Sequence, residues 1–295
     1  MDSSATATST EITLRSPGPA DADECARICF EAFGAIHDQH RFPRDFPALE
    51  MAAGMVGMMI PSPGHWGVVA ERDGRIMGSN FLDERDPIRG VGPITVDPHG
   101  QNAGVGRKLM EAVLERGGGA VGIRLLQDGF HMRSLSLYAS LGFEVKEPVV
   151  VVQGRPRSGP VAGVEVRPLE ERDLDECEAL CKRVHGFERT GELRDAIHAF
   201  APLVAIRNGR VVAYATTVTF WPMAHGVAES DEDMAALLLG AAASVEEPLA
   251  LLAPLRWPLF RWCLGEGLRL VKPMNLMAVG EYREPQAAWF PSVVY

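Results

Sequence analysis

The chain contains an internal sequence repeat, which limits the fold more than any other feature because it sets how many similar units are built. The first copy reads ITLR at residues 12–15 and DADECARIC at residues 21–29. The second copy reads VEVR at residues 164–167 and DLDECEALC at residues 173–181, at the same spacing and without a gap. The sequence therefore predicts two similar units in tandem.

A second similarity follows in the same order within each copy. Residues 69–77 read VAERDGRIM and residues 204–212 read VAIRNGRVV. In both, a two-residue Asp-Gly or Asn-Gly pair stands between alternating apolar residues, which is typical of a β-hairpin with a type I′ turn. Each copy thus predicts a hairpin at Asp73-Gly74 or at Asn208-Gly209.

A short strand and a helix precede each hairpin, and the helices are expected over Asp21–Phe33 and Asp173–His185. Residues 153–161 are rich in Gly and Pro and poor in apolar side chains, as linkers are. We therefore expect an α+β (α/β) fold of two tandem units, each with a mixed, mostly antiparallel sheet flanked by helices. The predicted bounds are a disordered tail at 1–10, a first domain at 11–152 and a second domain at 162–295.

Composition excludes several classes of protein. A chain of 295 residues with 46% hydrophobic and 23% charged residues can bury a large core, unlike a disordered or collagen-like chain. The net charge of −10 opposes nucleic acid and anionic membranes, so we expect neither as a partner. No apolar run reaches the about 18 to 20 residues of a membrane span. Residues 1–10 also lack the bases and apolar stretch of a signal peptide, which predicts a cytoplasmic protein.

The cysteines and two histidines are the candidate metal ligands. The repeated cysteines stand at i and i+4 on the expected helices, so each pair lies on one helix face and metal ligation stays possible. Core positions are favoured, because free Cys is among the most buried residue types and no paired CxxC groups occur. His37 and His40 have ligand-like spacing but no companion ligand nearby, so we interpret them as surface or loop histidines and predict no metal site.

The chemistry is expected at residues 94–110, ITVDPHGQNAGVGRKLM, which read as strand, glycine-bearing loop and helix. Unpaired N–H groups and the dipole at the start of a helix suit a phosphate or pyrophosphate. Leu109 stands where a dinucleotide fingerprint needs a third glycine, and Arg107 follows Gly106 where a Walker loop needs Lys. Both of those loops are excluded, and the remaining alternative to an anion site is a plain turn without a ligand.

Two motifs in this order resemble those of the GNAT superfamily of acetyl-CoA-dependent N-acetyltransferases. The first, Gln/Arg-x-x-Gly-x-Gly/Ala, is met by Gln101, Gly104 and Gly106. The second, small-x-x-Leu-Tyr-x-x-x-Gly-Phe, is met by residues 134–143. The resemblance covers about residues 11–152 and, through the repeat, the remainder at lower similarity.

The resemblance implies acetyl-CoA as co-substrate, with its pyrophosphate in the loop and its thioester held by the backbone at the end of the 94–96 strand. The family often has Asn three residues before the small residue of the second motif, where this chain has His131. That departure puts one side-chain contact in doubt but not the loop. The implied coenzyme-binding residues are Ile94, Thr95, Val96, Gln101, Asn102, Ala103, Gly104, Val105, Gly106, Arg107, His131 and Ser134.

Acetyl transfer to an amine needs a base, a donor to the carbonyl and an acid for the departing thiolate. The resemblance assigns the acid to Tyr138, whose phenol is protonated at neutral pH; the alternative is that it only packs on the coenzyme. The base stays open among an ordered water, Asp83, Glu84 and the terminal carboxylate of Tyr295. Residues 287–295 are too apolar for water, so we expect them inside the fold or between the two units.

The second copy has no equivalent glycine loop. Residues 224–234 read AHGVAESDEDM, in which Ser230 and Asp233 predict a helix-capping box. Four carboxylates at this helix start would repel a pyrophosphate, so we predict that this copy does not bind acetyl-CoA in the usual way. Five side chains are candidates for an acceptor cleft or for the core, the commoner place for aromatic residues: Trp221, His225, Trp257, Trp262 and Trp289.

The sequence thus predicts an N-acetyltransferase that moves acetyl by direct attack of a primary amine on a small molecule or peptide, working as a monomer or homodimer. A non-catalytic acyl-CoA-binding or regulatory module is the alternative. Binding to nucleic acid or ribosomes is disfavoured by the acidic balance and by the lack of a dense Lys/Arg stripe.

Overall fold

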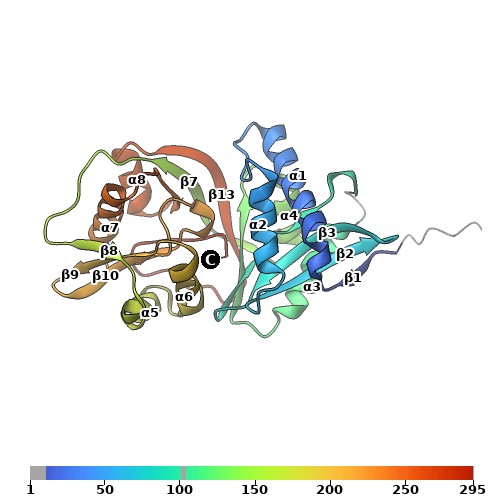
Figure 1. Cartoon of the computed structure of the whole chain (residues 1–295), viewed down its shortest axis with the longest axis horizontal. Coiled ribbons are helices and arrows are strands. Elements are labelled where there is room, and N and C mark those ends of the chain that lie inside the picture. Colours follow the sequence, from blue (N-terminus) through green and yellow to red (C-terminus); the bar gives the residue numbers. More distant parts are fainter. Residues whose placement is uncertain (1–10, 101–103, 295) are drawn as a thin grey trace, which may run out of the picture. The chain divides into compact units, whose positions relative to one another are not determined.

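The computed structural model describes residues 11–100 and 104–294 (Figure 1). The chain forms two compact units. The first comprises Met1–Asp83 and Val91–Gly119, and the second comprises Glu84–Gly90 and Ala120–Tyr295. Within the described ranges, no helix combines the length and the apolar character needed to cross a bilayer.

The first unit is an antiparallel sheet with helices on both faces. Its strands are β1 (Thr13–Arg15), β2 (His65–Arg72), β3 (Arg75–Asp83) and β5 (Thr95–Val96). β2 pairs with β1 and β3, and β5 pairs with β3. Its helices are α1 (Ala22–His40), α2 (Leu49–Met59) and α3 (Val105–Arg116).

Alternation along β3 decides which helix covers which face of this sheet. Phe81 packs with Cys25 of α1 and Val56 of α2, which run side by side in Figure 1. The neighbouring Asn80 points to the other face, where its amide donates to the carbonyl of Leu109 on α3 at 3.4 Å. Helices α1 and α2 therefore cover one face of this sheet, and α3 covers the other.

The second unit holds two sheets. The first sheet has the order β4-β6-β13-β7-β12, and the second has the order β14-β11-β10-β9-β8. The strands of the first sheet are β4 (Ile88–Val91), β6 (Gly122–Asp128), β7 (Glu144–Gly154), β12 (Leu249–Pro254) and β13 (Arg269–Gly280). Those of the second are β8 (Glu165–Pro168), β9 (Leu203–Arg207), β10 (Arg210–Ala215), β11 (Gly226–Ala228) and β14 (Trp289–Phe290). The helices are α4 (Met132–Ser140), α5 (Leu174–His185), α6 (Thr190–Ala199), α7 (Asp231–Ser244) and α8 (Pro258–Gly265).

Strand β13 joins the two sequence copies. It comes from the second copy, yet it lies between β6 and β7 of the first and pairs antiparallel with both. β7 then pairs along its other edge with β12, from Val149 opposite Pro254 to Gly154 opposite Leu249. Strands from both copies thus share one hydrogen-bonded sheet.

This sharing explains why the compact units and the sequence copies divide the chain at different places. β7 continues to Gly154, inside the expected linker at 153–161, and it pairs with β12 and β13, which come after that linker in the chain. The bounds 11–152 and 162–295 therefore describe the sequence copies and not the compact units. A loop without helix or strand separates β7 from β8.

Each copy nevertheless repeats the same local structure. Asp73 and Asn208 have φ of 53° and 54°, and Gly74 and Gly209 have φ of 74° and 75°. Positive φ at both central residues is what a type I′ turn requires, so the two predicted hairpins are confirmed. The two predicted helices are also present, and α1 continues to His40, beyond its expected end.

A bidentate ion pair is repeated as well. Arg15 contacts Asp21 through two N–H···O bonds of 2.7 and 2.9 Å, and Arg167 contacts Asp173 through two of 2.7 Å. In each copy the guanidinium lowers the pKa of the carboxyl, which also accepts from a backbone N–H three residues earlier. The carboxylate thereby ties the first strand to the start of the following helix.

The repeated cysteines are core residues, as the sequence favours. All four are buried, and burial raises the pKa of each thiol, to about 11 for Cys25 and Cys181 and to about 12 for Cys29. Cys177 and Cys181 pack with Tyr214 of the second sheet. α7 packs on the opposite face of that sheet, where its Leu237 lies in one core cluster with Ala205 of β9.

The repeated ion pair allows a matched test of burial. Side-chain exposure is 42% for Arg15 and 15% for Asp21, but 23% for Arg167 and 7% for Asp173. We expect Arg167→Met to lower the free energy of unfolding by about 1 to 3 kcal/mol, because it leaves a buried carboxylate without its cation. Arg15→Met should lower it by about 1 kcal/mol or less, because water screens the exposed pair. Urea unfolding of both variants measures this, and equal losses would contradict the role of burial.

Candidate functional site

The glycine loop leads into α3 in the first unit. Gly104 is the N-cap residue, with φ of 79° and ψ of 3°, a left-handed conformation that glycine adopts without strain. Having no side chain, Gly104 does not cap the first amides of α3, and the first turn carries no acidic residue. Val105, Gly106 and Arg107 form that turn, so their N–H groups and the helix dipole face the end of the loop. Gln101, Asn102 and Ala103 lie outside the described residues.

The strand before the loop is shorter than the sequence suggests. β5 contains Thr95 and Val96, whereas Ile94 precedes it and follows Pro93, which has no N–H for a ladder. The β5 backbone pairs with β3, and the Thr95 hydroxyl lies 3.3 Å from the hydroxyl of Ser79. Gly78 permits this approach, because a Cβ there would collide with the Thr95 carbonyl oxygen.

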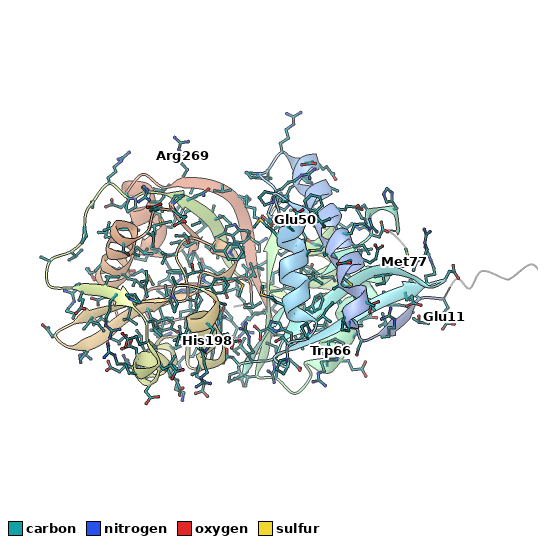
Figure 2. All side chains as sticks on the ribbon, in the orientation of Figure 1. Glu11, Glu50, Trp66, Met77, His198 and Arg269 are labelled. Atoms are coloured by element: carbon teal, nitrogen blue, oxygen red, sulfur yellow. The ribbon has the colours of Figure 1, made fainter. Side chains whose placement is uncertain are left out.

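The turn between β5 and the loop is fixed from two sides. Asp97 accepts from the N–H of His99 at 2.8 Å, and its own N–H donates to the carbonyl of Met77 at 2.9 Å. The Met77 side chain, labelled in Figure 2, fills the space that a Cβ at Gly100 would need. The first unit therefore holds a rigid entry to the loop.

The second motif forms α4 in the second unit. His131 is the N-cap residue, and its carbonyl accepts from the Ser134 hydroxyl and the Gln127 amide, both at 2.9 Å. Asn275 of β13 in turn donates to Gln127 at 2.8 Å. Ser134 and His131, both implied coenzyme contacts, are thus part of a polar cluster that fixes the start of α4.

Tyr138 lies on α4 with 8% of its surface exposed. Burial raises the pKa of its phenol, and the negative charge of Asp128 raises it further. The phenol therefore keeps its proton at neutral pH. Asp128 itself is buried and forms a 2.7 Å ion pair with Lys272 of β13.

Two of the residues that could act as the base, Asp83 and Glu84, lie in the described part of the chain. Asp83 is the last residue of β3 and is 7% exposed. Glu84 begins the second unit, and its carbonyl accepts a hydrogen bond from Arg89. Tyr295 lies outside the described residues.

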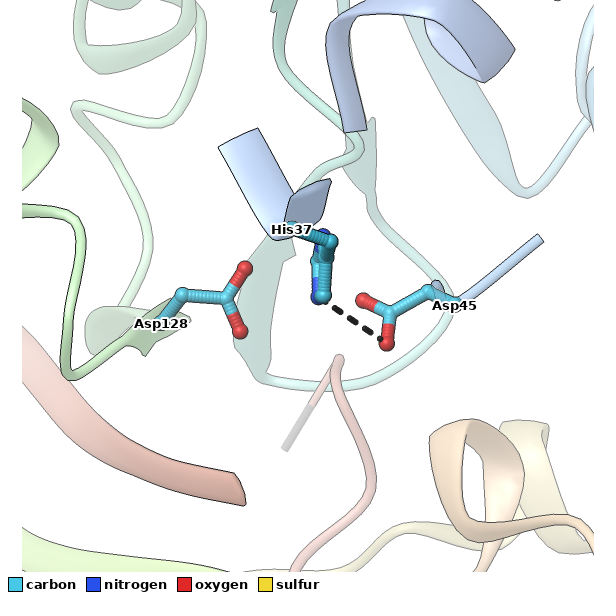
Figure 3. Close-up of side chains that lie close together, drawn as sticks. All are labelled: His37, Asp45 and Asp128. Carbon is cyan, nitrogen blue, oxygen red and sulfur yellow. Dashed lines mark ion pairs between the residues drawn. The ribbon is translucent and has the colours of Figure 1, made fainter. Parts of the chain in front are cut away.

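The interpretation of His37 as a surface or loop residue is wrong. Because α1 continues to His40, the His37 side chain is on a helix and fully buried. Its Nδ1 lies 2.7 Å from the carbonyl of Phe33, and its Nε2 lies 3.4 Å from a carboxylate oxygen of Asp45 (Figure 3). His40 is exposed, as expected.

The helix start in the second copy differs from that of α3. The Ser230 hydroxyl accepts from the Asp233 amide at 3.1 Å and donates to its carboxylate at 2.7 Å, so the predicted cap is confirmed. Asp231, Glu232 and Asp233 occupy the first turn of α7. The Ser230 side chain caps α7 and acidic side chains lie at the positive end of its dipole, whereas α3 begins at a glycine and has no acid in its first turn.

Arginines neutralise two of the four carboxylates that the sequence places at this helix start. Glu229 pairs with Arg183 at 2.9 Å and with Arg210 at 3.3 Å, and Asp233 pairs with Arg207 at 2.7 Å. The repulsion of a pyrophosphate is therefore weaker than four free charges would give. A cavity of about 260 Å³ next to this helix start is lined by Asp231, Glu232, Met234, Ala235, Pro258, Leu259 and Trp262.

Comparison with known families decides the kind of domain. The sequence model of the acetyltransferase (GNAT) domain matches residues 63–145. This stretch of the chain is therefore similar in sequence to a GNAT acetyltransferase domain. Both motifs lie within this match, including Gly104 and Tyr138. No curated protein matches the chain in sequence.

Solved structures similar to this chain extend the GNAT fold beyond the matched domain. A Pyrococcus horikoshii protein assigned as an acetyltransferase covers 96% of this chain and 94% of its own, at 16% identity and a TM-score of 0.75. A GCN5-related N-acetyltransferase from Sphaerobacter thermophilus covers 92% and 96%, at 16% identity and a TM-score of 0.62. A tandem GNAT protein from the clavulanic acid biosynthesis pathway covers 91% and 98%, at 13% identity and a TM-score of 0.56. The fold is therefore that of two tandem GNAT-like units.

The second GNAT-like copy contains a buried polar network. Arg189 contacts the Nδ1 of His225 at 3.1 Å and the Ser292 hydroxyl at 3.2 Å, and it forms an ion pair with Glu192. Ser292 donates to Glu192 at 2.8 Å, and the Tyr214 hydroxyl lies 3.2 Å from the Nε2 of His225. The sequence alone indicates only His225 as a candidate site residue, because the other members of the network come from segments far apart in the chain.

Among the candidates for an acceptor cleft, two are core residues. Trp289 and His225 are buried, with 0% and 1% of their surfaces exposed. Trp289 packs edge-on against His185 and Trp257, at ring distances of 5.6 and 6.4 Å. Trp257, Trp221 and Trp262 are half-buried.

The buried histidines predict loss of stability in acid. Burial and the positive charge of Arg189 lower the pKa of His185 to about 3 and also lower that of His225. Unfolding frees both to protonate below about pH 6.5, so their stabilising effect is complete above that pH and is lost as pH falls toward 3. We expect the free energy of unfolding to fall by up to about 1.4 kcal/mol per pH unit for each histidine.

Urea unfolding between pH 7.5 and 5.0 measures this loss. His185→Gln should reduce the slope by about half, because one of the two histidines is removed. His198→Gln is the control, since His198 is exposed on α6 (Figure 2). A wild-type slope in His185→Gln would show that this histidine does not act as described.

Proposed function

We propose that this protein is an acetyl-CoA-dependent N-acetyltransferase that transfers acetyl to a primary amine of a small molecule or peptide by direct attack. The observation that carries the proposal is the start of α3 inside the GNAT domain, at Gly104. Its first turn has neither a side-chain cap on the N-cap residue nor an acidic residue, and it follows a glycine loop. Such a start binds a pyrophosphate through backbone N–H groups and the helix dipole.

In this proposal the first copy holds the coenzyme. The loop from Gln101 to Arg107 binds the pyrophosphate, and the backbone of Ile94, Thr95 and Val96 holds the acetyl thioester. His131 and Ser134 at the start of α4 contact the coenzyme from the second motif. Arg107 is exposed, which suits a charged group that meets phosphate in solvent.

Transfer then needs one bond exchange and two proton movements. The neutral amine attacks the thioester carbon, a C–N bond forms, and the C–S bond breaks as coenzyme A leaves. Tyr138 gives its phenolic proton to the departing sulfur, and the proton lost by the amine passes to a base that the proposal leaves open. The raised pKa of Tyr138 ensures that the proton is present at neutral pH.

The second copy is proposed to lack a coenzyme site. Ser230 caps α7, and the carboxylates of Asp231 and Glu232 stand where a pyrophosphate would bind. One coenzyme per chain is therefore expected, with the second copy completing the shared sheet instead.

The helix start can be tested with a pair of matched glycines. Gly104 and Gly74 have φ of 79° and 74°, and open space surrounds both. Gly104→Glu should weaken acetyl-CoA binding at least about tenfold, because the carboxylate competes with the pyrophosphate for the α3 amides. Gly74→Glu places the same side chain in a hairpin turn and should leave binding unchanged. Calorimetry should give one site per wild-type chain, and two sites or equal affinities would contradict the proposal.

The acid is tested by Tyr138→Phe. We expect kcat to fall by about 100-fold, because the thiolate leaves without a positioned proton, while affinity for acetyl-CoA is kept. In the wild type, ionisation of Tyr138 should not lower kcat below about pH 10, since its pKa is raised above the usual value.

Tyr282→Phe is the control, because the buried Tyr282 hydroxyl has no hydrogen-bond partner in the described structure. Release of free coenzyme thiol with a panel of polyamines, aminoglycosides, amino acids and peptides measures turnover. Full turnover in Tyr138→Phe with an unaltered pH profile would remove Tyr138 as the acid. Coenzyme binding without thiol release from any amine would favour a non-catalytic acyl-CoA-binding module.

A further inference from the structure

Strand β13 of the second copy carries a buried lysine. The side chains of Lys272, Met274 and Leu276 are all buried, as alternation along one face of a strand requires. The ladder with β7 shifts register between Leu270 and Lys272, and the extra residue of such a bulge changes the face to which the next side chain points. Leu270, on the other side of the bulge, is exposed. The bulge thus comes directly before a buried charged side chain, whose partners must lie nearby.

Two side chains of the second unit hold the Lys272 ammonium. It forms an ion pair of 2.7 Å with the carboxylate of Asp128, the last residue of β6, and it lies 4.8 Å from the centre of the Trp221 ring. An indole face attracts a cation, and more strongly where water is excluded. A buried ammonium depends on such partners, because a charge that leaves water loses its hydration. Movement of the ammonium away from Asp128 is therefore disfavoured.

Asp128 lies at the turn that leads from β6 into α4. It stands opposite Met274 at the end of the ladder with β13. Its carbonyl accepts from the N–H of His131, the N-cap residue of α4, at 2.8 Å. The N–H of Gly129 donates to the carbonyl of Pro273 at 2.9 Å. β13 thus holds this turn through a backbone hydrogen bond as well as through the ion pair.

The charge of Asp128 also acts on the phenol of Tyr138 in α4. Burial raises the pKa of the phenol, and the negative charge of Asp128 raises it further. The same charge would oppose the phenolate that forms when Tyr138 gives up its proton. The Lys272 ammonium stands beside Asp128 and offsets that charge. All three residues belong to the second unit.

Taken with the proposed function, on which this inference rests, we propose that Lys272 is a positioning residue for acetyl transfer, which holds Asp128 at the turn before α4 and offsets the charge that opposes proton donation by Tyr138. As the C–S bond breaks, the phenolic proton passes to the departing sulfur, and a phenolate remains until a proton returns from solvent. The ammonium keeps its own protons throughout. The second copy thereby supplies a charge to the chemistry of the first.

Lys272→Met tests this role, because it removes the ammonium and keeps a side chain of similar length. We expect kcat for thiol release to fall about tenfold, with the affinity for acetyl-CoA kept, because the carboxylate then opposes the phenolate. Lys272→Arg keeps a cation, and the double variant Lys272→Met/Asp128→Asn removes both charges. Each should have a kcat several-fold above that of Lys272→Met. A wild-type kcat in Lys272→Met, or equal kcat in the three variants, would overturn the inference.

The Tyr138→Phe background separates the charge effect from support of the fold. Without a phenol to ionise, Lys272→Met should lower the remaining kcat by less than about twofold. A tenfold loss in both backgrounds would show that Lys272 only supports the fold, and it would contradict the inference. If Lys272→Met does not fold, Lys272→Gln, which is uncharged but polar, takes its place in every comparison.

Arg167→Met is the matched control. Asp173 and Asp128 both have 7% of their side chains exposed, and each lies 2.7 Å from its cation. Arg167→Met should lower the midpoint of thermal unfolding, as Lys272→Met does, but it should leave kcat unchanged. A tenfold loss of kcat in Arg167→Met would mean that lost stability, and not the charge beside Tyr138, sets the rate.

Wild-type behaviour separates this inference from the proposed function. If the wild type does not bind acetyl-CoA, or binds it and releases no thiol with any amine of the panel, both fall. If it releases thiol and Tyr138→Phe is fully active, the acid and this inference fall, and the acetyltransferase remains. If Tyr138→Phe loses activity but the Lys272 variants do not follow the pattern above, only this inference falls.

Discussion

The insertion of β13 between β6 and β7 is the constraint on which the second unit depends. Backbone N–H and C=O groups in the middle of a sheet must be paired, and β13 supplies the partners for one edge of each neighbour. β13 belongs to the second sequence copy, whereas β6 and β7 belong to the first. The two copies therefore share a sheet, and strands of each copy find hydrogen-bond partners in the other. Asn275 of β13 also bonds to Gln127 of β6, which holds the carbonyl of His131 at the start of α4.

The same repeat produced two different helix starts. α3 begins at a left-handed glycine with no acid in its first turn, and α7 begins at a serine cap followed by three acids. The two helices are at equivalent places in the repeat, so the difference lies in side chains and not in topology. Acidic side chains already stabilise the positive end of the α7 dipole, so a pyrophosphate would gain little by binding there. The second copy thus keeps the fold of a GNAT unit and serves the shared sheet.

The buried polar groups of the second unit fix the positions of the segments that carry them more than they raise the free energy of unfolding. Arg189, Glu192 and Ser292 each have at most 5% of their surface exposed, and Ser292 bonds to the other two from a segment far away in the chain. Such networks rarely stabilise a protein more than apolar packing does, yet they penalise alternative positions, because each alternative leaves a charge unpaired. That selectivity explains how Ser292 keeps a fixed place, although it lies outside any helix or strand.

The sequence by itself determined the repeat, the two type I′ turns, the paired helices, the buried cysteines and the Ser230 cap, because each depends on residues close together in the chain. It also carried both GNAT motifs. Only the tertiary structure decided the position of β13, the burial of His37, the charges that neutralise Glu229 and Asp233, and the ion pair of Lys272 with Asp128. Those features depend on which distant segments share a sheet edge or a cavity, and backbone hydrogen bonding is the same for every strand, so local sequence does not select among them.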